Sequence, residues 1–501
     1  MHIHAPPVVG SKHLFNKSLI LYLPKVATGV LGSLAMAFIL RKGGAGVLGE
    51  LVIVCSYWGF ISLLGANAIG IAMQRQFSIS EVKTPERSAR LMKDALLLQL
   101  VFSLITAALG GTLYVFVMSW IYKTSQFNAY LLPGIFLYIG SNFISFFRFA
   151  LRGLQMFKTI SVMDTLESTT RNVVWIIAVL LNGGVLGLLL GHIIASSLST
   201  LFGMIILSQG LFRRPGDYAV SHKRRILRES LSFSSVSVSA YFMFTFPNLI
   251  MAKYLGSEAV GLFSGIIRIG DTIVAPMTSI GIVFAPSLTQ AEAGDQKQFH
   301  HLLEKSFKLV VFFALVIGLV IANSEDLFKF FFRSQPAGES FIAYGVAMYA
   351  FTAALHGTFG VYLDFLGFGR LRAWLLTGFC LLNITVTYFA SKYFNVVVAT
   401  FAYLGVFLTL TFALLWIFTS QYSTVFISKN LKFLRTVLVA AVPAILIAKF
   451  IVGSGDSDSV INLIVHMGLR SVVYLGIAGT LFLFMNPQFN FVFFKKKTSG
   501  T

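Results

Sequence analysis

The sequence predicts an all-α polytopic membrane protein with about fourteen transmembrane helices. Three observations predict this class: apolar stretches of about 20 residues, loops that alternate between strongly basic and nearly uncharged, and an internal repeat. The 501 residues are 56% hydrophobic and only 12% charged, and the mean hydropathy is +0.81. A soluble domain of this length would be far less apolar, so we expect most of the chain to lie in a lipid bilayer.

The apolar stretches define the expected membrane-spanning helices in order along the chain. The first stretch is too long for the core of a signal peptide and has no clear small-residue cleavage site, so we expect it to remain as a helix. An even number of spans places both termini on the same side of the membrane. The expected spans lie near residues 18–40, 47–70, 95–120, 129–147, 159–181, 185–208, 230–252, 259–285, 306–323, 341–366, 373–391, 394–419, 433–452 and 460–485.

Basic residues are distributed unevenly among the loops. Most of the 39 Lys and Arg residues lie in alternate loops, including 75–93, 148–158 and 213–228, whereas the intervening loops hold few. Because cationic loops resist translocation, the basic loops and both termini are predicted to be cytoplasmic. The net charge of +20 is then explained by topology and by anionic lipid headgroups, and nucleic-acid binding is not favoured.

The chain matches itself at an offset of about 212 residues. Six helices in each repeat predict two parallel bundles related by an axis along the membrane normal, with the substrate site of an alternating-access transporter between them. Three pairs of segments correspond: Gly44 and Gly49 with Gly256 and Gly261, residues 91–96 with 302–307, and Gly153 with Gly367.

The repeat predicts four segments. Residues 1–212 form an N-terminal six-helix bundle, and residues 213–228 form a basic cytoplasmic linker. Residues 229–428 form the second six-helix bundle, and residues 429–501 add two helices and a basic cytoplasmic tail.

Several kinds of chemistry have no sequence signature here. The run GxxxxGK[ST] that cradles nucleotide phosphates is missing, as are HExxH and CxxC, so we expect no ATP-driven step and no cofactor or metal. Cys55 and Cys380 both lie in apolar stretches and predict neither a disulfide framework nor a metal cluster. The longest outer loop, 323–340, is short and of mixed charge, and we expect it to form a solvated rim.

The residues after the linker resemble a known family. The stretch 248–264 (NLIMAKYLGSEAVGLFS) is followed by Ile267-Arg268-Ile269, by Ala285-Pro286-Ser287-Leu288, and later by 365–371 (FLGFGRL). These runs are similar to those of the polysaccharide-type branch of the multidrug/oligosaccharidyl-lipid/polysaccharide exporter superfamily, which contains the lipid-linked oligosaccharide flippases. The resemblance extends over most of the chain. One departure is Asn248, because many relatives carry Asp near the middle of this helix, which puts a cation or proton role of that position in doubt.

Five basic residues lie inside predicted helices, where a charge is costly unless it faces protein or water. Arg268 and Asp271 share one face near the middle of their helix, so they are either a self-neutralising pair or a phosphate-binding group in which Asp271 steers the Arg268 guanidinium. The resemblance implies the second interpretation, because lipid II flippases of the superfamily are thought to use an Arg and an acidic residue on this helix. The other four are Lys25, Arg171, Lys449 and Arg470.

Each of these four has an alternative interpretation. Lys25 follows Pro24 and is either a second phosphate contact or a side chain that extends to the cytoplasmic interface. Arg171 either contributes to the cationic cavity or forms an i,i+4 salt bridge with Glu167. Arg470 has no acidic partner in its own helix and is a further candidate for a groove, whereas Lys449 is expected to extend to the interface.

Taken with the resemblance, these residues predict a flippase. The expected substrate is a polyprenyl-diphosphate-linked oligosaccharide for O-antigen, capsule or exopolysaccharide, moved across the bacterial inner membrane by two rocking bundles around a cationic cavity.

Coupling candidates are Asn248 and His356, the latter because imidazole titrates near neutrality. Expected partners are the glycan, membrane lipids, and the glycosyltransferases and polymerase of the pathway. A cation-coupled multidrug exporter of the same fold is the second hypothesis, and a glycan polymerase or ligase is the third, disfavoured by the short outer loops.

Overall fold

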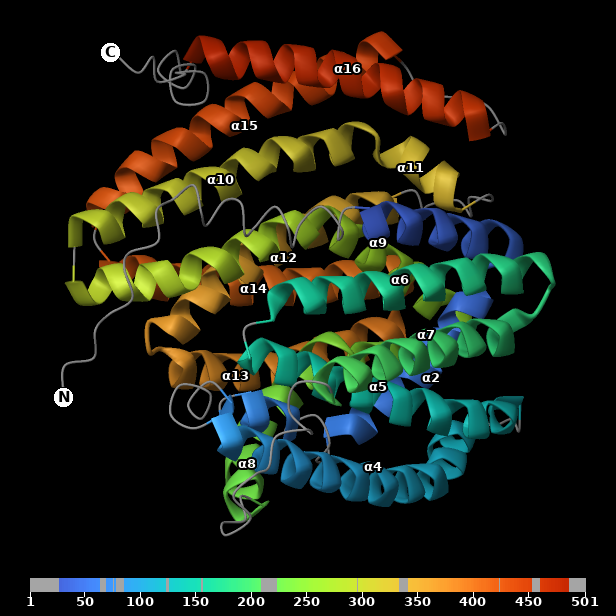
Figure 1. The fold of residues 1–501 in the computed structure, drawn as a ribbon. Helices are drawn as coiled ribbons and strands as arrows, with labels where there is room; N and C mark the ends of the chain where they lie inside the picture. The colour runs from blue at the N-terminus through green and yellow to red at the C-terminus, as the bar shows by residue number, and fades with distance from the viewer. Residues whose placement is uncertain are drawn as a thin grey trace, which may run out of the picture. The chain divides into compact units, whose positions relative to one another are not determined.

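The computed structural model describes residues 27–63, 69–74, 76–77, 85–122, 126–154, 156–208, 223–294, 296–332, 341–422, 424–452 and 460–485. Every element within these ranges is a helix, and no strand occurs among them (Figure 1). Nine of the described helices are long and apolar enough to cross a membrane. The predicted class, an all-α polytopic membrane protein, is confirmed.

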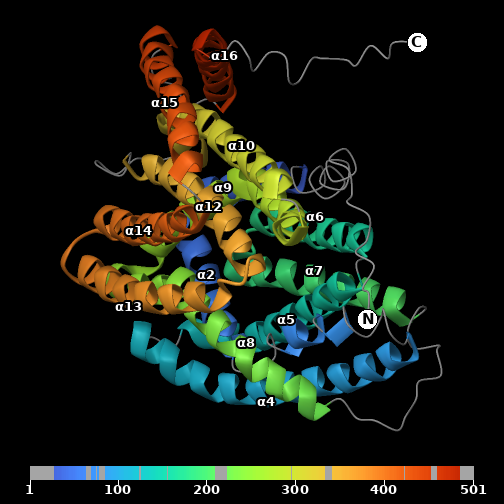
Figure 2. The same ribbon diagram turned by 90° about the vertical axis from the view of Figure 1, so that its left-hand side faces the viewer.

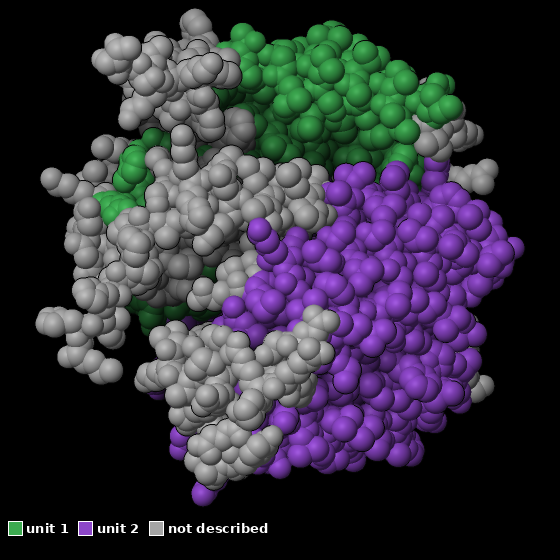
Figure 3. Space-filling view, viewed as in Figure 1, with its two compact units in different colours: residues 1–14, 276–368, 411–501 green, residues 15–275, 369–410 purple. Residues whose placement is uncertain are grey.

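The described chain forms two compact units, which are coloured separately in Figure 3. Unit 2 comprises the described residues of 15–275 and 369–410, and unit 1 those of 276–368 and 411–501. These units do not follow chain order, and α9 and α14 cross from one unit to the other. The predicted segments 1–212, 213–228, 229–428 and 429–501 rest on the sequence repeat and stay a prediction.

Unit 2 begins with a helix over residues 27–38 and contains most of the elements of the first half of the chain. In order they are η1 (Ile39–Gly43), α2 (Ala45–Leu63), α4 (Pro85–Tyr122), η2 (Gln126–Tyr130), α5 (Leu131–Gly153), α6 (Phe157–Leu180), α7 (Gly184–Leu207), α8 (Lys223–Phe244), the first part of α9 (Phe246–Gly294), α13 (Gly369–Tyr393) and the first part of α14 (Val396–Tyr422).

Buried aromatic side chains fill the space between α2, α4 and α5. Trp58 contacts the rings of Tyr57, Tyr114 and Tyr138, with ring centroids 5.4–6.0 Å apart. The hydroxyl of Tyr57 donates to the carbonyl oxygen of Gly110 at 2.5 Å, and that of Tyr114 donates to the carbonyl oxygen of Phe127 at 3.1 Å. Such internal partners are needed because a bilayer core offers no water to buried polar groups.

Helices α6 and α7 form an antiparallel hairpin, and α7 also packs against α5 (Figure 1). α13 packs along α8, which also contacts α4 (Figure 2). Side-chain hydrogen bonds join α13 to α8: the hydroxyls of Ser239 and Thr377 are 2.9 Å apart, and Asn383 Nδ2 donates to the carbonyl oxygen of Met243 at 2.7 Å. Helices α8 and α13, which belong to the second half of the predicted repeat, therefore lie in the same unit as the N-terminal helices.

Unit 1 contains the last part of α9, α10 (Gln296–Ala322), α11 (Ser324–Phe331), α12 (Ile342–Phe365), the end of α14, α15 (Thr424–Val452) and α16 (Val460–Met485). Helices α15 and α16 pack against each other and against α10. The hydroxyl of Tyr474 on α16 donates to the carbonyl oxygen of Leu315 on α10 at 2.8 Å. α11 occupies part of the stretch for which the sequence predicts a loop.

The repeated glycines Gly44 and Gly256 adopt the same backbone conformation. Their φ and ψ angles are 86° and 161° at Gly44 and 85° and 178° at Gly256, a region that only glycine enters at low cost. Gly44 separates η1 from α2, whereas Gly256 kinks α9 where the sequence predicts a loop. One conformation at equivalent places of the two halves supports the predicted repeat.

The other two repeated glycines bring α2 and α9 into direct backbone contact. A Cβ at Gly49 would overlap the carbonyl oxygen of Ser257, and a Cβ at Gly261 would overlap the carbonyl oxygen of Ala45. Ala45 and Ser257 are equivalent in the repeat, so the contact is reciprocal. We call Gly49, Gly261, Ala45 and Ser257 the glycine clasp. Close approach at small residues is a general means of joining helices in membranes, where lipid tails leave little hydrophobic drive.

Candidate functional site

The candidate site is a cavity of about 240 Å³ in unit 2, beside α9. One face of α9 lines it, because positions 263, 264, 267, 268 and 271 recur at the spacing of successive helical turns. α2 and the junction of α8 with α9 form the remaining walls. The lining residues are Val52, Cys55, Ser56, Phe244, Thr245, Asn248, Phe263, Ser264, Ile267, Arg268 and Asp271.

Arg268 is the cation of this cavity. Among the described residues its guanidinium has no acidic partner within ion-pair distance and no hydrogen bond, and it forms no ion pair with Asp271. Both side chains nevertheless line the same cavity. The backbone of Arg268 is held in place by α9 and accepts a hydrogen bond from Thr272 Oγ1 at 3.1 Å. Arg268 and Asp271 therefore line one cavity without a direct ion pair, and the choice between a self-neutralising pair and a phosphate-binding group stays a prediction.

Trp175 on α6 supports the Arg268 guanidinium. The guanidinium carbons of Arg268 and Arg171 each lie 5.4 Å from the centre of the Trp175 ring, a cation–π distance. The ring is 2% exposed, and its Nε1 donates to the carbonyl oxygen of Leu188 at 2.8 Å. His192 packs edge-on at 5.0 Å between centroids. Sequence reasoning missed Trp175, although its position four residues after Arg171 placed it on the same helical face.

Arg171 itself belongs to a neutralised network between α5 and α6. Arg171 Nη1 is 2.9 Å from Glu167 Oε1, which is the i,i+4 salt bridge that the sequence offers as one interpretation. Arg148 lies 2.7 Å from Asp164 and 2.9 Å from the second oxygen of Glu167. Two arginines and two carboxylates thus balance each other. Arg171 forms the salt bridge and shares the Trp175 ring with Arg268, but it does not line the cavity, and its contribution to a cationic cavity stays a prediction.

Part of the cavity wall, formed by Ser56, Asn248 and Ser264, is polar but uncharged. Asn248 Nδ2 donates to Ser56 Oγ at 3.1 Å, and the carbonyl oxygen of Ser56 accepts a hydrogen bond from the Tyr241 hydroxyl. Asn248 Oδ1 and Ser264 Oγ have no hydrogen-bond partner within the described part of the chain. Asn248 is 8% exposed and Ser264 is 5% exposed. Two buried polar atoms in this wall are left for a ligand.

The other predicted site residues do not extend this cavity. Lys25 lies outside the described residues. Arg470 and His356 belong to unit 1, where His356 is buried in α12. Arg470 finds its acid on another helix: its Nη1 is 3.0 Å from Asp326 Oδ2 of α11 and donates to the carbonyl oxygen of Ala322 at 3.1 Å.

One expectation for unit 1 needs correction. The sequence predicts Asp326 in a solvated rim, but it is fully buried at 0% exposure because α11 folds inward to meet Arg470. Lys449 has its Nζ 3.4 Å from Glu325 and donates to the Tyr344 hydroxyl at 3.0 Å, and its extension to the membrane interface stays a prediction. Both contacts join residues far apart in the sequence.

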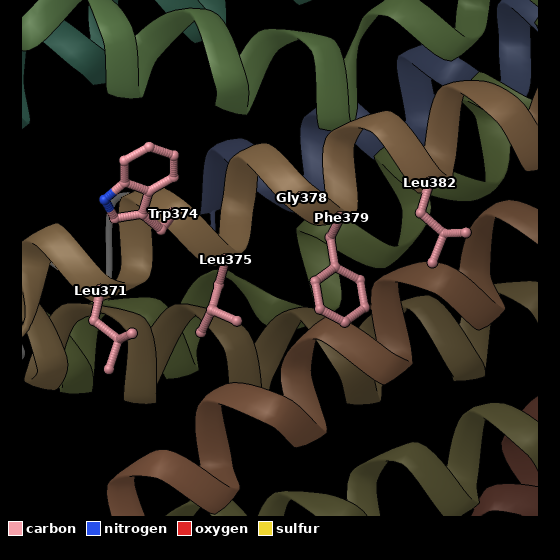
Figure 4. A pocket seen from close by; sticks show the side chains of 6 residues that line it. All are labelled: Leu371, Trp374, Leu375, Gly378, Phe379 and Leu382. Carbon is pink, nitrogen blue, oxygen red and sulfur yellow. The ribbon is translucent and has the colours of Figure 1, made fainter.

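A second cavity, of about 290 Å³, follows α13 (Figure 4). It is lined by Leu371, Trp374, Leu375, Gly378, Phe379 and Leu382 and contains no charged side chain. Trp374 is 68% exposed, as expected for a ring on the lipid-facing side of a membrane helix. No group of three or more metal-binding side chains occurs among the residues described, and Cys55 and Cys380 are free thiols.

A multi-pass chain whose described elements are all helices, with Arg268 and Asp271 in a cavity between them, is typical of membrane transporters. Residues 17–292, more than half of the chain, match the family described as Polysaccharide biosynthesis protein, and the chain belongs to this family. No curated protein matches the sequence significantly.

Several solved structures of transporters share the fold of this chain. The lipid II flippase MurJ in its inward closed conformation is similar at a TM-score of 0.72 and 12% identity, over 93% of this chain and 99% of that one. An inward-facing multidrug resistance transporter of the MATE family reaches 0.65 at 15% identity, over 81% and 96% of the two chains. The MATE multidrug transporter DinF-BH, solved as a complex, reaches 0.62 at 17% identity, over 83% and 97%.

Proposed function

We propose that this protein is a flippase that carries a polyprenyl-diphosphate-linked oligosaccharide from the cytoplasmic to the outer leaflet by alternating access. The observation that carries the proposal is Arg268, a guanidinium that faces a cavity in a membrane helix and has no acidic partner among the described residues. An intramembrane charge costs several kcal/mol unless it faces water or a partner, which indicates that a functional ligand neutralises it.

The chemistry of Arg268 suits a diphosphate. A guanidinium presents a planar fork of N–H donors that matches phosphate oxygens in bidentate fashion, and it stays charged at every physiological pH. The Trp175 ring supports the guanidinium carbon and leaves the N–H edges available to a ligand. Asp271 on the same face supplies a nearby negative charge, which lowers the cost of the cation when the cavity is empty.

The size of the cavity indicates which part of the substrate it holds. At about 240 Å³ it is smaller than the roughly 300–1,000 Å³ of pockets that enclose a drug-sized ligand. A diphosphate with part of one sugar fits, whereas a whole oligosaccharide does not. In the proposed cycle, entry of the glycan therefore requires the helices around α9 to separate.

The wider assignment follows from the family. We place the protein in the bacterial inner membrane with cytoplasmic termini, in O-antigen, capsule or exopolysaccharide synthesis, without catalytic activity of its own. The polymerase and glycosyltransferases of that pathway would be its partners. The membership of the chain in a polysaccharide biosynthesis family supports this context.

The second candidate function is a cation-coupled multidrug exporter, because transporters of the MATE family share the fold. The cavity argues against it. Its cation is not neutralised by an ion pair among the described residues, and the position at which many relatives carry Asp is the neutral Asn248. Beside Arg268 a cationic drug would meet repulsion and an anion would meet attraction that low dielectric strengthens, while Asp271, the one carboxylate of the lining, offsets part of both.

The test is transport in proteoliposomes. The assay follows the transfer of a short polyprenyl-diphosphate disaccharide from one leaflet to the other. It compares the native chain with Arg268→Ala, Arg268→Lys and the control Arg224→Ala, which changes an exposed arginine of α8. We expect transport by the native and control proteins, loss of at least tenfold with alanine, and partial recovery with lysine. Export of cationic dyes without glycolipid transport would refute the proposal and favour the drug exporter.

A further inference from the structure

The uncharged wall of the cavity contains two polar atoms that the proposed phosphate contact does not use. Asn248 Oδ1 and Ser264 Oγ are buried, have no hydrogen-bond partner among the described residues, and belong to residues that line the cavity. Buried polar atoms are normally paired, and leaving one unpaired is costly. Two such atoms in one wall indicate a ligand that supplies their hydrogen bonds.

The orientation of Asn248 is fixed by its neighbours. Its Nδ2 donates to Ser56 Oγ at 3.1 Å, which holds one end of the amide, and Oδ1 at the other end has no hydrogen-bond partner among the described residues. Ser56 is held in turn by α2 and by the Tyr241 hydroxyl, which donates to its carbonyl oxygen. The wall therefore offers a fixed acceptor at Asn248 and a hydroxyl at Ser264 that can donate or accept.

The arrangement selects a ligand chemistry. Ser264 precedes Arg268 by four residues on α9, which separates the two by about 6 Å along the helix axis. Phe244 and Phe263 line the same cavity and present apolar faces. A ligand that fits has an anionic group at Arg268 and, one helical turn away, a ring with hydroxyl groups at its edge and C–H groups on its face. A sugar bonded directly to a phosphate has these features.

A bound metal cation fits the wall less well. The oxygens of Asn248, Ser264 and Ser56 are neutral, and the one carboxylate of the lining, Asp271, shares its helical face with Arg268, which would repel a cation. No cluster of metal-binding side chains occurs in the described part of the chain.

We propose that Asn248 and Ser264 form a subsite for the sugar that is bonded to the diphosphate, and that this subsite determines which first sugar is accepted. The inference rests on the proposed function, because it assumes that Arg268 binds the diphosphate. In this arrangement Arg268 sets the affinity for every prenyl diphosphate, whereas Asn248 and Ser264 distinguish one first sugar from another.

The test compares two probes in binding assays on the purified full-length protein. One probe is a short prenyl diphosphate without sugar, and the other carries a single sugar on the same diphosphate. We expect Asn248→Leu and Ser264→Ala each to weaken binding of the sugar-bearing probe about tenfold, because each removes one hydrogen bond to a buried group. Binding of the sugar-free probe should not change. Arg268→Ala should weaken both probes. As a second measurement, a deoxy-sugar probe should bind the native protein about tenfold more weakly than the sugar-bearing probe, and equal binding would contradict the subsite.

The outcomes separate the two proposals. If the native protein binds both probes but the Asn248 and Ser264 variants weaken them equally or not at all, the subsite is wrong and the proposed function stands. If the native protein binds neither probe, the proposed function fails and the subsite fails with it. If the probes bind in the presence of Na⁺ but not of choline, and Asn248→Leu abolishes this dependence on Na⁺, then Asn248 and Ser264 bind a cation and the inference is overturned.

Discussion

Arg268 and Arg470 are two arginines of membrane helices whose surroundings are opposite. Arg470 in unit 1 is 1% exposed, its guanidinium is 3.0 Å from the fully buried Asp326, and it donates to a backbone carbonyl. Arg268 in unit 2 faces a cavity, rests on Trp175 and has no acidic partner in the described chain. The same residue type thus serves stability in one place and is available to a ligand in the other. Intramembrane position alone does not distinguish these roles, but the partner does.

The largest effect on stability should come from breaking the buried ion pair between Arg470 and Asp326. Arg470→Ala or Asp326→Ala should lower the free energy of unfolding by about 3–5 kcal/mol, because each leaves an uncompensated buried charge. Thermal and denaturant unfolding in detergent would measure this. The double variant Arg470→Met, Asp326→Leu is the control and should lie near the native value, since no charge remains. Single variants with native stability would show that the two arginines do not differ in this way.

A second variant would give Arg171 the surroundings of Arg268. Glu167→Gln removes the carboxylate that Arg171 and Arg148 share, while Arg148 keeps Asp164. We expect a loss of about 1–3 kcal/mol in stability, the cost of weakening a partly buried network. The added positive charge beside Trp175 should also tighten binding of a sugar-free prenyl diphosphate severalfold. Weaker binding would contradict the assignment of this region as the diphosphate site. Glu304→Gln, in an exposed pair of α10, is the control.

A third variant tests the aromatic support. Trp175→Leu removes the ring beneath both guanidinium groups, and a cation–π contact contributes about 0.5–2 kcal/mol. Affinity for the prenyl diphosphate should therefore fall about threefold to thirtyfold, and Trp175→Phe should recover part of it. Isothermal titration of the three proteins would measure the difference. Equal losses with Leu and Phe would indicate a packing role only.

The smallest effect is expected for the stability of Arg268 variants. Arg268→Leu removes a charge without an acidic partner in the described chain, so the free energy of unfolding should change by less than about 1 kcal/mol even though transport is lost. A melting temperature measured beside that of Arg470→Ala would show the contrast directly. A drop as large as that of Arg470→Ala would mean that Arg268 is structural.

The sequence predicted the fold class because hydropathy and charge asymmetry act locally and can be read along the chain. It also located Arg268 and Asn248, since a charge or an amide inside an apolar stretch stands out. It could not predict the partner of Arg470, because Asp326 lies on a separate helix and reaches it only through the folding of α11. The same holds for Trp175, which belongs to α6 but supports a residue of α9.

The helix boundaries likewise include features that the sequence predicts and features that it does not. Gly44 and Gly256 are visible in the sequence as a repeat, because a positive φ demands glycine at both places. The predicted break between two helices is present at Gly256 as a kink with non-helical backbone angles, and it is shorter than the predicted loop. Ser264 was missed altogether, because a serine in a membrane helix usually bonds its own backbone and carries no signal in sequence.

The glycine clasp has a consequence for energy coupling. Its contacts between α2 and α9 are made by main-chain atoms at Gly49, Gly261, Ala45 and Ser257, none of which gains or loses a proton or holds an ion. The strength of the clasp is therefore the same at every pH and ionic strength at which the helices persist. If transport by this protein depends on a proton or sodium gradient, that dependence must arise from titratable or ion-binding groups elsewhere in the chain.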